Sequence, residues 1–168
     1  MQKGFTLIEL MVTLVVLVVS LSVGVPSFVT WIKNNRIDTA TRTIAGALQL
    51  ARNEAVSQQS VISVSPGTVD NPGSWTNGAH IYTDTGSLGT PYNAGTDTLL
   101  KNIDVDLSGI IITDNDSNNV ISFRGSGLLN EGGAERTITF CQSSGETDGT
   151  SVIINPAGRA TINTVNNC

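Results

Sequence analysis

Glu9 is the residue whose chemistry stands out first, because it is the only charged side chain between Phe5 and Val25. The rest of this run is mainly Leu, Val, Ile and Met, and a helix of about 20 apolar residues spans a hydrocarbon core of roughly 30 Å. A carboxylate within such a helix is costly unless it is paired. We therefore expect Glu9 to have a functional partner. The alternative is a glutamate close enough to the membrane surface to reach water.

The polar leader, residues 1–4, ends in Gly4 before the apolar run begins. A secretory signal peptide carries a small-residue cleavage site after its apolar run, and no A-x-A site follows this one. Cleavage after Gly4 would leave the apolar helix on the mature protein. It would remove Lys3, one of nine basic residues, and leave eight against 14 acidic ones, a net charge of −6. Such a charge gives no general attraction to nucleic acid or anionic lipid.

His80 is the single histidine, and it lies between Ala79 and Ile81 in an expected strand. Without a thiol nucleophile or a second histidine beside it, it is predicted to be a surface or strand residue rather than a general base. The sequence also has no Gly-rich phosphate loop, zinc-ligand spacing or nucleophile elbow. We predict that the protein is not an enzyme and that it uses no cofactor or metal.

Residues 114–119, Asp-Asn-Asp-Ser-Asn-Asn, begin like a calcium-binding loop, with oxygen ligands at alternate positions. The glycine expected sixth in such a loop is Asn119, and the glutamate expected twelfth is Gly125. A polar hairpin turn accounts for the same residues, and it is the prediction we prefer.

Two helical segments must position the N-terminal residues. Beyond Pro26, which permits a bend, a second helix is predicted to continue to Gln59. Its apolar positions are spaced by sevens, fours and threes along one face, as in a helix that packs on a sheet. These positions are Ile37, Ile44, Leu48, Ala51 and Ala55. If the two segments join, they form one long helix.

After Gln59 the hydrophobic period becomes alternating, and turn formers separate the apolar segments. Thr83–Thr98 is expected to be a long surface loop. The fold class predicted is α+β: a long N-terminal helix, with a transmembrane half and an amphipathic half, packed on an antiparallel β-sheet or sandwich. The predicted strands are Val61–Val64, His80–Tyr82, Leu99–Ile103, Gly109–Ile112, Val120–Phe123, Arg136–Cys141 and Ser151–Asn155.

The N-terminal sequence Gly4-Phe5-Thr6-Leu7-Ile8-Glu9-Leu10 resembles the prepilin motif of type IV pilins and type II secretion pseudopilins. In that family a dedicated peptidase cuts after the glycine, here Gly4, and N-methylates the next residue, here Phe5. The resemblance implies that Glu9 neutralises the N-terminal amine of a neighbouring subunit during filament assembly. Pro26 lies where the family often has a helix-bending proline.

Three later segments, residues 50–57, 121–125 and 152–159, are similar to the GspH/FimT branch of the family, which includes the minor pilins FimU and FimT. The middle of the chain, residues 66–116, matches only loosely. The resemblance implies a type IV pilin fold with four parts. These are a prepilin leader at 1–4, a transmembrane or filament-core helix at 5–25, its amphipathic continuation at 26–59 and a β-rich head domain at 60–168.

Cys141 and Cys168 are the only cysteines. Because the head would be exported to an oxidising compartment, we expect a disulfide between them. In the chain-entropy model such a bridge stabilises a fold by about 3 to 4 kcal/mol. The alternatives are two free thiols or a catalytic pair, and no C-x-x-C motif supports the second.

The function implied by the resemblance is that of a minor pilin, a structural subunit that helps initiate assembly of a type IV pilus and is incorporated into it. A single helix would hold it in the bacterial inner membrane, with the head in the periplasm, before it enters a periplasmic or extracellular filament. Its implied partners are other major and minor pilins, the prepilin peptidase and the inner-membrane assembly platform. A minor pseudopilin of a type II secretion system is the alternative that the sequence leaves open.

A DNA-binding pilin for natural transformation is the second alternative. FimT-type members bind DNA through basic residues around a C-terminal glycine-arginine motif, which here is Gly158-Arg159. The second arginine expected two places on is Thr161, and the tail to Cys168 has no other basic residue. Because phosphate binding draws on clustered Lys and Arg, we prefer for Arg159 a turn arginine that pairs with an acid or caps a strand.

Overall fold

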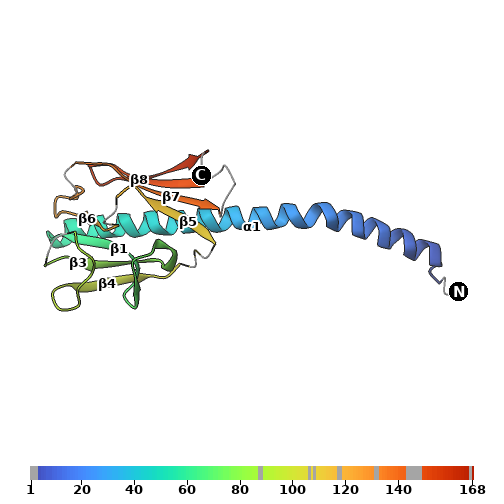
Figure 1. The fold of residues 1–168 in the computed structure, drawn as a ribbon, viewed down its shortest axis with the longest axis horizontal. Coiled ribbons are helices and arrows are strands. Elements are labelled where there is room, and N and C mark those ends of the chain that lie inside the picture. The colour runs from blue at the N-terminus through green and yellow to red at the C-terminus, as the bar shows by residue number, and fades with distance from the viewer. Residues whose placement is uncertain are drawn as a thin grey trace. The chain divides into compact units, whose positions relative to one another are not determined.

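The protein has an α+β fold, as its sequence predicted (Figure 1). The computed structural model describes residues 4–86, 89–105, 107, 109–116, 119–130, 133–142, 149–166 and 168. The chain divides into two compact units, Met1–Asn35 and Arg36–Cys168. The elements in chain order are α1 (Leu7–Gln58), β1 (Ile62–Thr68), β2 (Asn71–Pro72), the 3-10 turn η1 (Trp75–Asn77), β3 (Ala79–Thr83), β4 (Thr98–Ile103), β5 (Ile110–Asp114), β6 (Ile121–Phe123), β7 (Arg136–Gln142), β8 (Gly149–Ile154) and β9 (Ala160–Val165).

Both ends of α1 are capped. The hydroxyl of Thr6 accepts a hydrogen bond from the backbone N–H of Glu9 at 3.3 Å, which is half of a T-x-x-E capping box. At the other end Gln59 has a φ of 52°, and the N–H of Ser60 donates to the carbonyl of Ala55 at 3.3 Å, the pattern of a Schellman ending. The two predicted helical segments are thus one helix of 52 residues. The bend predicted at Pro26 stays a prediction.

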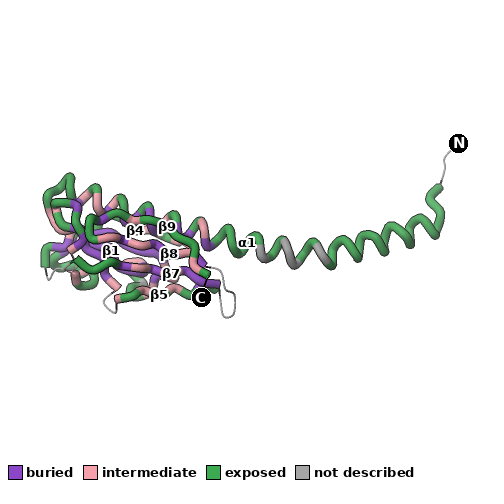
Figure 2. The backbone as a smooth tube through the Cα atoms, turned by 90° about the horizontal axis from the view of Figure 1, so that it is seen from above, coloured by how far each residue is buried: buried purple, intermediate pink, exposed green. Residues whose placement is uncertain are grey.

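The first unit presents its side chains to solvent. Every residue between 4 and 35 whose burial the structure describes is exposed (Figure 2). Most of them are large and apolar, from Phe5 at 83% exposure to Ile32 at 40%. Among the described residues, no helix combines the length and the apolar composition that crossing a membrane requires.

The second unit contains the rest of α1 and two antiparallel sheets. The first sheet has the order β2-β1-β3-β4, with β6 also pairing with β1, and the second has the order β5-β7-β8-β9. In the first sheet Val64 lies opposite both Ile81 and Ile121. In the second sheet Ile138 lies opposite Val152. These cross-strand apolar pairs give each sheet a hydrophobic face.

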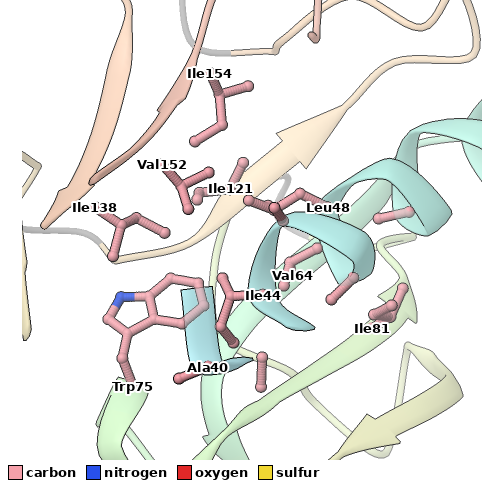
Figure 3. Packing of buried hydrophobic residues seen from close by; sticks show 14 of the residues in the cluster. Ala40, Ile44, Leu48, Val64, Trp75, Ile81, Ile121, Ile138, Val152 and Ile154 are labelled. Carbon is pink, nitrogen blue, oxygen red and sulfur yellow. The ribbon is translucent and has the colours of Figure 1, made fainter. Parts of the chain in front are cut away.

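The core lies between α1 and the two sheets (Figure 3). The five helix positions predicted to share one face are all buried, which confirms the predicted amphipathic helix. They belong to one hydrophobic cluster with apolar residues of the first sheet, such as Val64 and Ile81, and of the second, such as Ile138 and Val152. Neither sheet buries its apolar face without the helix, so α1 joins them in one core.

Seven of the observed strands overlap the seven predicted ones. Two strands were not predicted: β9, which is an exposed edge strand, and the two-residue β2. Exposed edge strands have little hydrophobic signal, because only their pairing with a neighbour specifies them. The predicted Thr83–Thr98 loop does connect β3 to β4, although Asp84 and Asp97 within it are buried.

The first sheet has buried residues on both faces. An alternating hydrophobic pattern predicts only one buried face. Ile62 and Val64 of β1 belong to the core, yet the alternate residues Ser63 and Ser65 are buried as well. The hydroxyl of Ser63 donates to Asp84 at 2.7 Å, which ties the β3–β4 loop to the sheet. His80, predicted to be a surface or strand residue, is a strand residue with 1% exposure.

Candidate functional site

The predicted processing site lies in an open segment that precedes α1. A Cβ added to Gly4 would meet no heavy atom within 4 Å, and Phe5 is 83% exposed. An accessible backbone is what a peptidase acting at this bond requires. Cleavage after Gly4 and N-methylation of Phe5 stay predictions.

Glu9 lies in the first turn of α1, where its backbone N–H is held by the hydroxyl of Thr6. A carboxylate in this turn interacts favourably with the helix dipole. The sequence analysis missed this local role, although T-x-x-E before an apolar run is a recognisable signal. Glu9 can therefore stabilise the start of the helix without a partner subunit, and any test of intersubunit pairing must separate the two roles.

The described apolar side chains of the first unit form a candidate interaction surface. Apolar side chains are exposed on successive helical positions, such as Leu14, Val15, Val16, Leu17 and Val18, so they surround the helix rather than follow one stripe. Contiguous exposed apolar patches mark sites of protein or membrane contact. This surface is suited to burial against other apolar helices or lipid.

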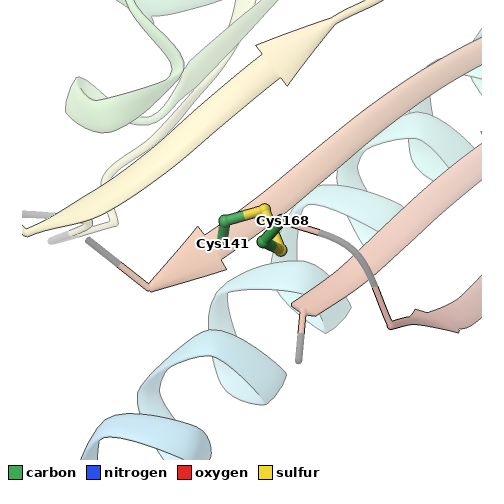
Figure 4. The surroundings of a disulfide bond; sticks show 2 residues. All are labelled: Cys141 and Cys168. Atoms are coloured by element: carbon green, nitrogen blue, oxygen red, sulfur yellow. A yellow bond between two sulfur atoms is a disulfide. The ribbon is translucent and has the colours of Figure 1, made fainter. Parts of the chain in front are cut away.

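A disulfide joins Cys141 of β7 to Cys168, as the sequence predicted (Figure 4). The two Cα atoms are 5.7 Å apart. Gly149, opposite Cys141 in the ladder, leaves room for the bridge, because a Cβ there would overlap the sulfur of Cys168 and lie 3.4 Å from that of Cys141. The bridge thus fixes the C-terminal residue against the second sheet.

Removing this disulfide is expected to lower the free energy of unfolding of the head by about 3 to 4 kcal/mol, since the bridge closes a loop with a sequence separation of 27. The measurement is denaturant unfolding of the wild type and of the Cys141→Ala/Cys168→Ala variant. Dithiothreitol should destabilise the wild type to the level of the variant and leave the variant unchanged. An unfolding midpoint that is the same in both proteins would contradict this stabilising role.

Asp114 and Asp116, which begin the candidate calcium-binding segment, take part in an ion-pair network. Arg136 and Asp114 have side chains that are each 2% exposed, and they meet at 2.9 Å. The same guanidinium lies 2.9 Å from Asp116 and donates to the carbonyl of Val120 at 3.2 Å. The carboxylates of the candidate calcium loop therefore bind a guanidinium. Residues 117 and 118 lie outside the described residues, and within the described ones no group of three or more His, Cys, Asp or Glu side chains gathers.

Gly127 and Gly158 lie in two turns that pack closely against Arg52 of α1. The Nε of Arg52 donates to the carbonyl of Gly127 at 2.9 Å. A Cβ on Gly127 would lie 2.9 Å from Val56, and one on Gly158 would lie 2.9 Å from the Nε of Arg52. Arg52 is half-buried and forms a contact between α1 and the later turns.

Arg159 lies in the turn between β8 and β9, as predicted. Its N–H donates to the side chain of Asn155 at 3.0 Å, and Gly158 donates to the carbonyl of Asn155 at 2.8 Å. Arg159 and Arg52 both line a polar groove of about 240 Å³. The tail that follows Arg159 contains no basic residue, and its basic neighbour in this groove, Arg52, comes from α1.

The segment that contains Arg52, Gly127 and Gly158 matches a known family. The family model described as type II transport protein GspH matches residues 40–158. The chain belongs to the GspH family. The model of the prokaryotic N-terminal methylation motif matches residues 1–25, so the two matches cover the N-terminal motif and most of the second unit.

Three solved structures are similar to this chain over most of its length. Two crystal structures of the type IV minor pilin FimU from Pseudomonas aeruginosa are each 25% identical to the chain. One has a TM-score of 0.63 and covers 79% of this chain and 92% of FimU, and the other has a TM-score of 0.59 over 75% and 91%. The minor pseudopilin EpsH of the Vibrio cholerae type 2 secretion system is 14% identical, with a TM-score of 0.47, over 78% of this chain and 97% of EpsH. A search of curated protein sequences found no match.

The protein is thus a type IV pilin-like member of the GspH family, with the fold that the sequence predicted. Members of this minor pilin and pseudopilin group are structural subunits rather than enzymes. The GspH match begins at Ala40 in α1 and ends at Gly158. It therefore contains the contact of Arg52 with both glycines, whereas Arg159 and β9 follow it.

Proposed function

We propose that this GspH-family protein is a minor pilin that helps initiate assembly of a type IV pilus and is incorporated into it. The observation that carries the proposal is the exposure of every described side chain of residues 4–35 on a helix that continues into the head. The head's likeness to the minor pilin FimU supports the same function. A structural subunit needs such a surface, since burying apolar area against neighbours contributes about 25 cal/mol per Å².

Processing comes first in the proposed sequence of events. The prepilin peptidase cleaves after Gly4 and N-methylates Phe5, and residues 5–25 hold the subunit in the bacterial inner membrane with its head in the periplasm. With help from the assembly platform, the helix then leaves the lipid and packs among the helices of other pilins in a periplasmic or extracellular filament. The apolar surface serves both environments.

Glu9 selects the correct neighbour in this proposal. Its carboxylate pairs with the amine of Phe5 on an adjacent subunit, which keeps its positive charge after methylation. Both groups lose water when the helices pack together. An unpaired buried charge is strongly destabilising, and pairing removes most of that penalty.

Mass spectrometry of filaments sheared from cells tests the proposal. A peptide that begins at N-methylated Phe5, at low abundance beside the major pilin, is expected. Replacement of Gly4 by leucine should remove this peptide and leave the leader attached, whereas Gln2→Asn in the same leader should change nothing. A mature mass in the Gly4→Leu variant would place the cleavage site elsewhere.

A minor pseudopilin of a type II secretion system is the second candidate, because the family model that matches the chain is described as a type II transport protein. The same experiment distinguishes the two functions. Mature protein found only in the membrane fraction, while surface filaments remain intact, would favour the pseudopilin. DNA binding through Arg159 is not proposed, since the mature chain has a net charge of −6.

A further inference from the structure

A cavity of about 230 Å³ lies on the first sheet. Its walls include Pro66 of β1, Val69 and Pro72 of the β1–β2 hairpin, and Pro91 and Tyr92 of the β3–β4 loop, and His80 of β3 also lines it. His80 alternates along its strand with the core residues Ala79 and Ile81, so the cavity is on the face of the sheet turned away from α1. The pilin function proposed above does not use it.

The histidine in this wall has a hydrogen-bond partner for one of its two ring nitrogens. The Nδ1 of His80 lies 2.7 Å from the carbonyl oxygen of Gly67. Because a carbonyl can only accept, Nδ1 donates this bond, which leaves Nε2 as the ring nitrogen that can accept one. The His80 ring stacks on Tyr82 at 5.6 Å and meets Tyr92 edge-on at 5.8 Å, so its orientation is fixed by its neighbours.

The loop that forms one wall is held in place without a ligand. The hydroxyl of Tyr82 donates to the carbonyl of Thr90 at 2.5 Å, and the N–H of Asn93 donates to the buried Asp97 at 2.8 Å. These bonds flank Pro91 and Tyr92 on both sides. Burial raises the pKa of Tyr82 to about 12, so its hydroxyl remains a donor at all physiological pH values. The wall is therefore preorganised, which lowers the entropy cost of binding.

We propose that this cavity binds an aromatic ring that carries one O–H or N–H donor. An apolar cavity of about 150 Å³ accommodates benzene, so a volume of 230 Å³ has room for a substituted ring. Tyr92 offers an aromatic contact, the prolines offer apolar walls, and Nε2 of His80 accepts the hydrogen bond. The ring can belong to a free phenol or to a tyrosine or tryptophan side chain of a protein partner.

The test measures binding of 4-fluorophenol and fluorobenzene to the full chain in detergent micelles by ¹⁹F NMR. We expect 4-fluorophenol to bind several-fold more tightly than fluorobenzene, because only the phenol can donate to His80. Val69→Trp, which fills the cavity from its half-buried rim, should abolish binding of both. His80→Phe keeps a ring in the wall and should remove the preference for the phenol.

Equal signals from the wild type and Val69→Trp would mean that the probes enter only the micelle, and this result would overturn the proposal. So would a phenol preference that survives His80→Phe, since the acceptor would then lie elsewhere. A short peptide with a central tyrosine identifies the source of the ring. Displacement of 4-fluorophenol by this peptide indicates a protein side chain, and retention of the probe indicates a small phenol.

Discussion

Asp114→Ala is expected to lower the free energy of unfolding of the head by about 3 to 5 kcal/mol, because it leaves a buried guanidinium without its most enclosed partner. Arg136 and Asp114 are both 2% exposed and 2.9 Å apart. Asp114 also accepts the N–H of Asp116 at 3.1 Å, which shapes the turn after β5. Denaturant unfolding, followed by the fluorescence of the buried Trp75 in a Trp31→Phe background, measures the loss.

Asp116→Ala is the matched control. Asp116 lies at the same distance from Arg136, 2.9 Å, but its side chain is 41% exposed. Water screens such a pair, so the expected loss is about 1 kcal/mol or less. Arg136→Met combined with Asp114→Ala should cost less than the sum of the two single changes, since the double variant leaves no buried charge of this pair uncompensated. A loss below about 1 kcal/mol for Asp114→Ala would show that the pair does not stabilise the head.

Glu9→Gln is expected to reduce incorporation into filaments more than tenfold while processing and membrane insertion continue. Glutamine at this position can still complete the capping box with Thr6, so the variant removes the charge and keeps the helix start. Loss of a charge pair in an apolar environment costs several kcal/mol, and 1.4 kcal/mol is a factor of ten. Quantitative mass spectrometry of sheared filaments against the membrane fraction gives the ratio.

Thr6→Val is the control that separates capping from pairing. It removes the hydroxyl that accepts from Glu9 and keeps the carboxylate, so helix stability falls by about 1 kcal/mol while incorporation stays near the wild-type level. If Thr6→Val is impaired as strongly as Glu9→Gln, the role of Glu9 is to start the helix. If Glu9→Gln is incorporated normally, its charge has no part in assembly.

Local patterns in the sequence were sufficient for the helix and for most strands. All five predicted face positions of the helix are buried: Ile37, Ile44, Leu48, Ala51 and Ala55. They could be predicted because helical periodicity depends on residues near one another in the chain and not on the element that covers the face. The disulfide could be predicted for a similar reason. With only Cys141 and Cys168 in the chain, an exported head has a single possible intramolecular pairing.

Contacts between distant elements could not be read in this way. Arg136 meets Asp114 because β5 pairs with β7 in one register, which sets Asp114 opposite Ile138. The sequence shows only two acidic residues in a polar segment and an arginine well beyond them, and it favoured a polar hairpin turn over a calcium loop without indicating the ion pair. Gly125 is a similar case, since a Cβ there would lie 2.7 Å from the backbone of Gln59 at the end of α1.

The N-terminal motif, the apolar run, the amphipathic helix and the α+β class could all be predicted, because each depends on the types and spacing of residues close together in the chain. Three features follow only from the folded arrangement: His80 is buried and contacts Tyr92 of the β3–β4 loop, Arg52 donates to Gly127, and Arg136 pairs with Asp114. Those contacts depend on strand register and loop placement. They join residues far apart in the chain, and no regular spacing in the sequence indicates which residues will meet.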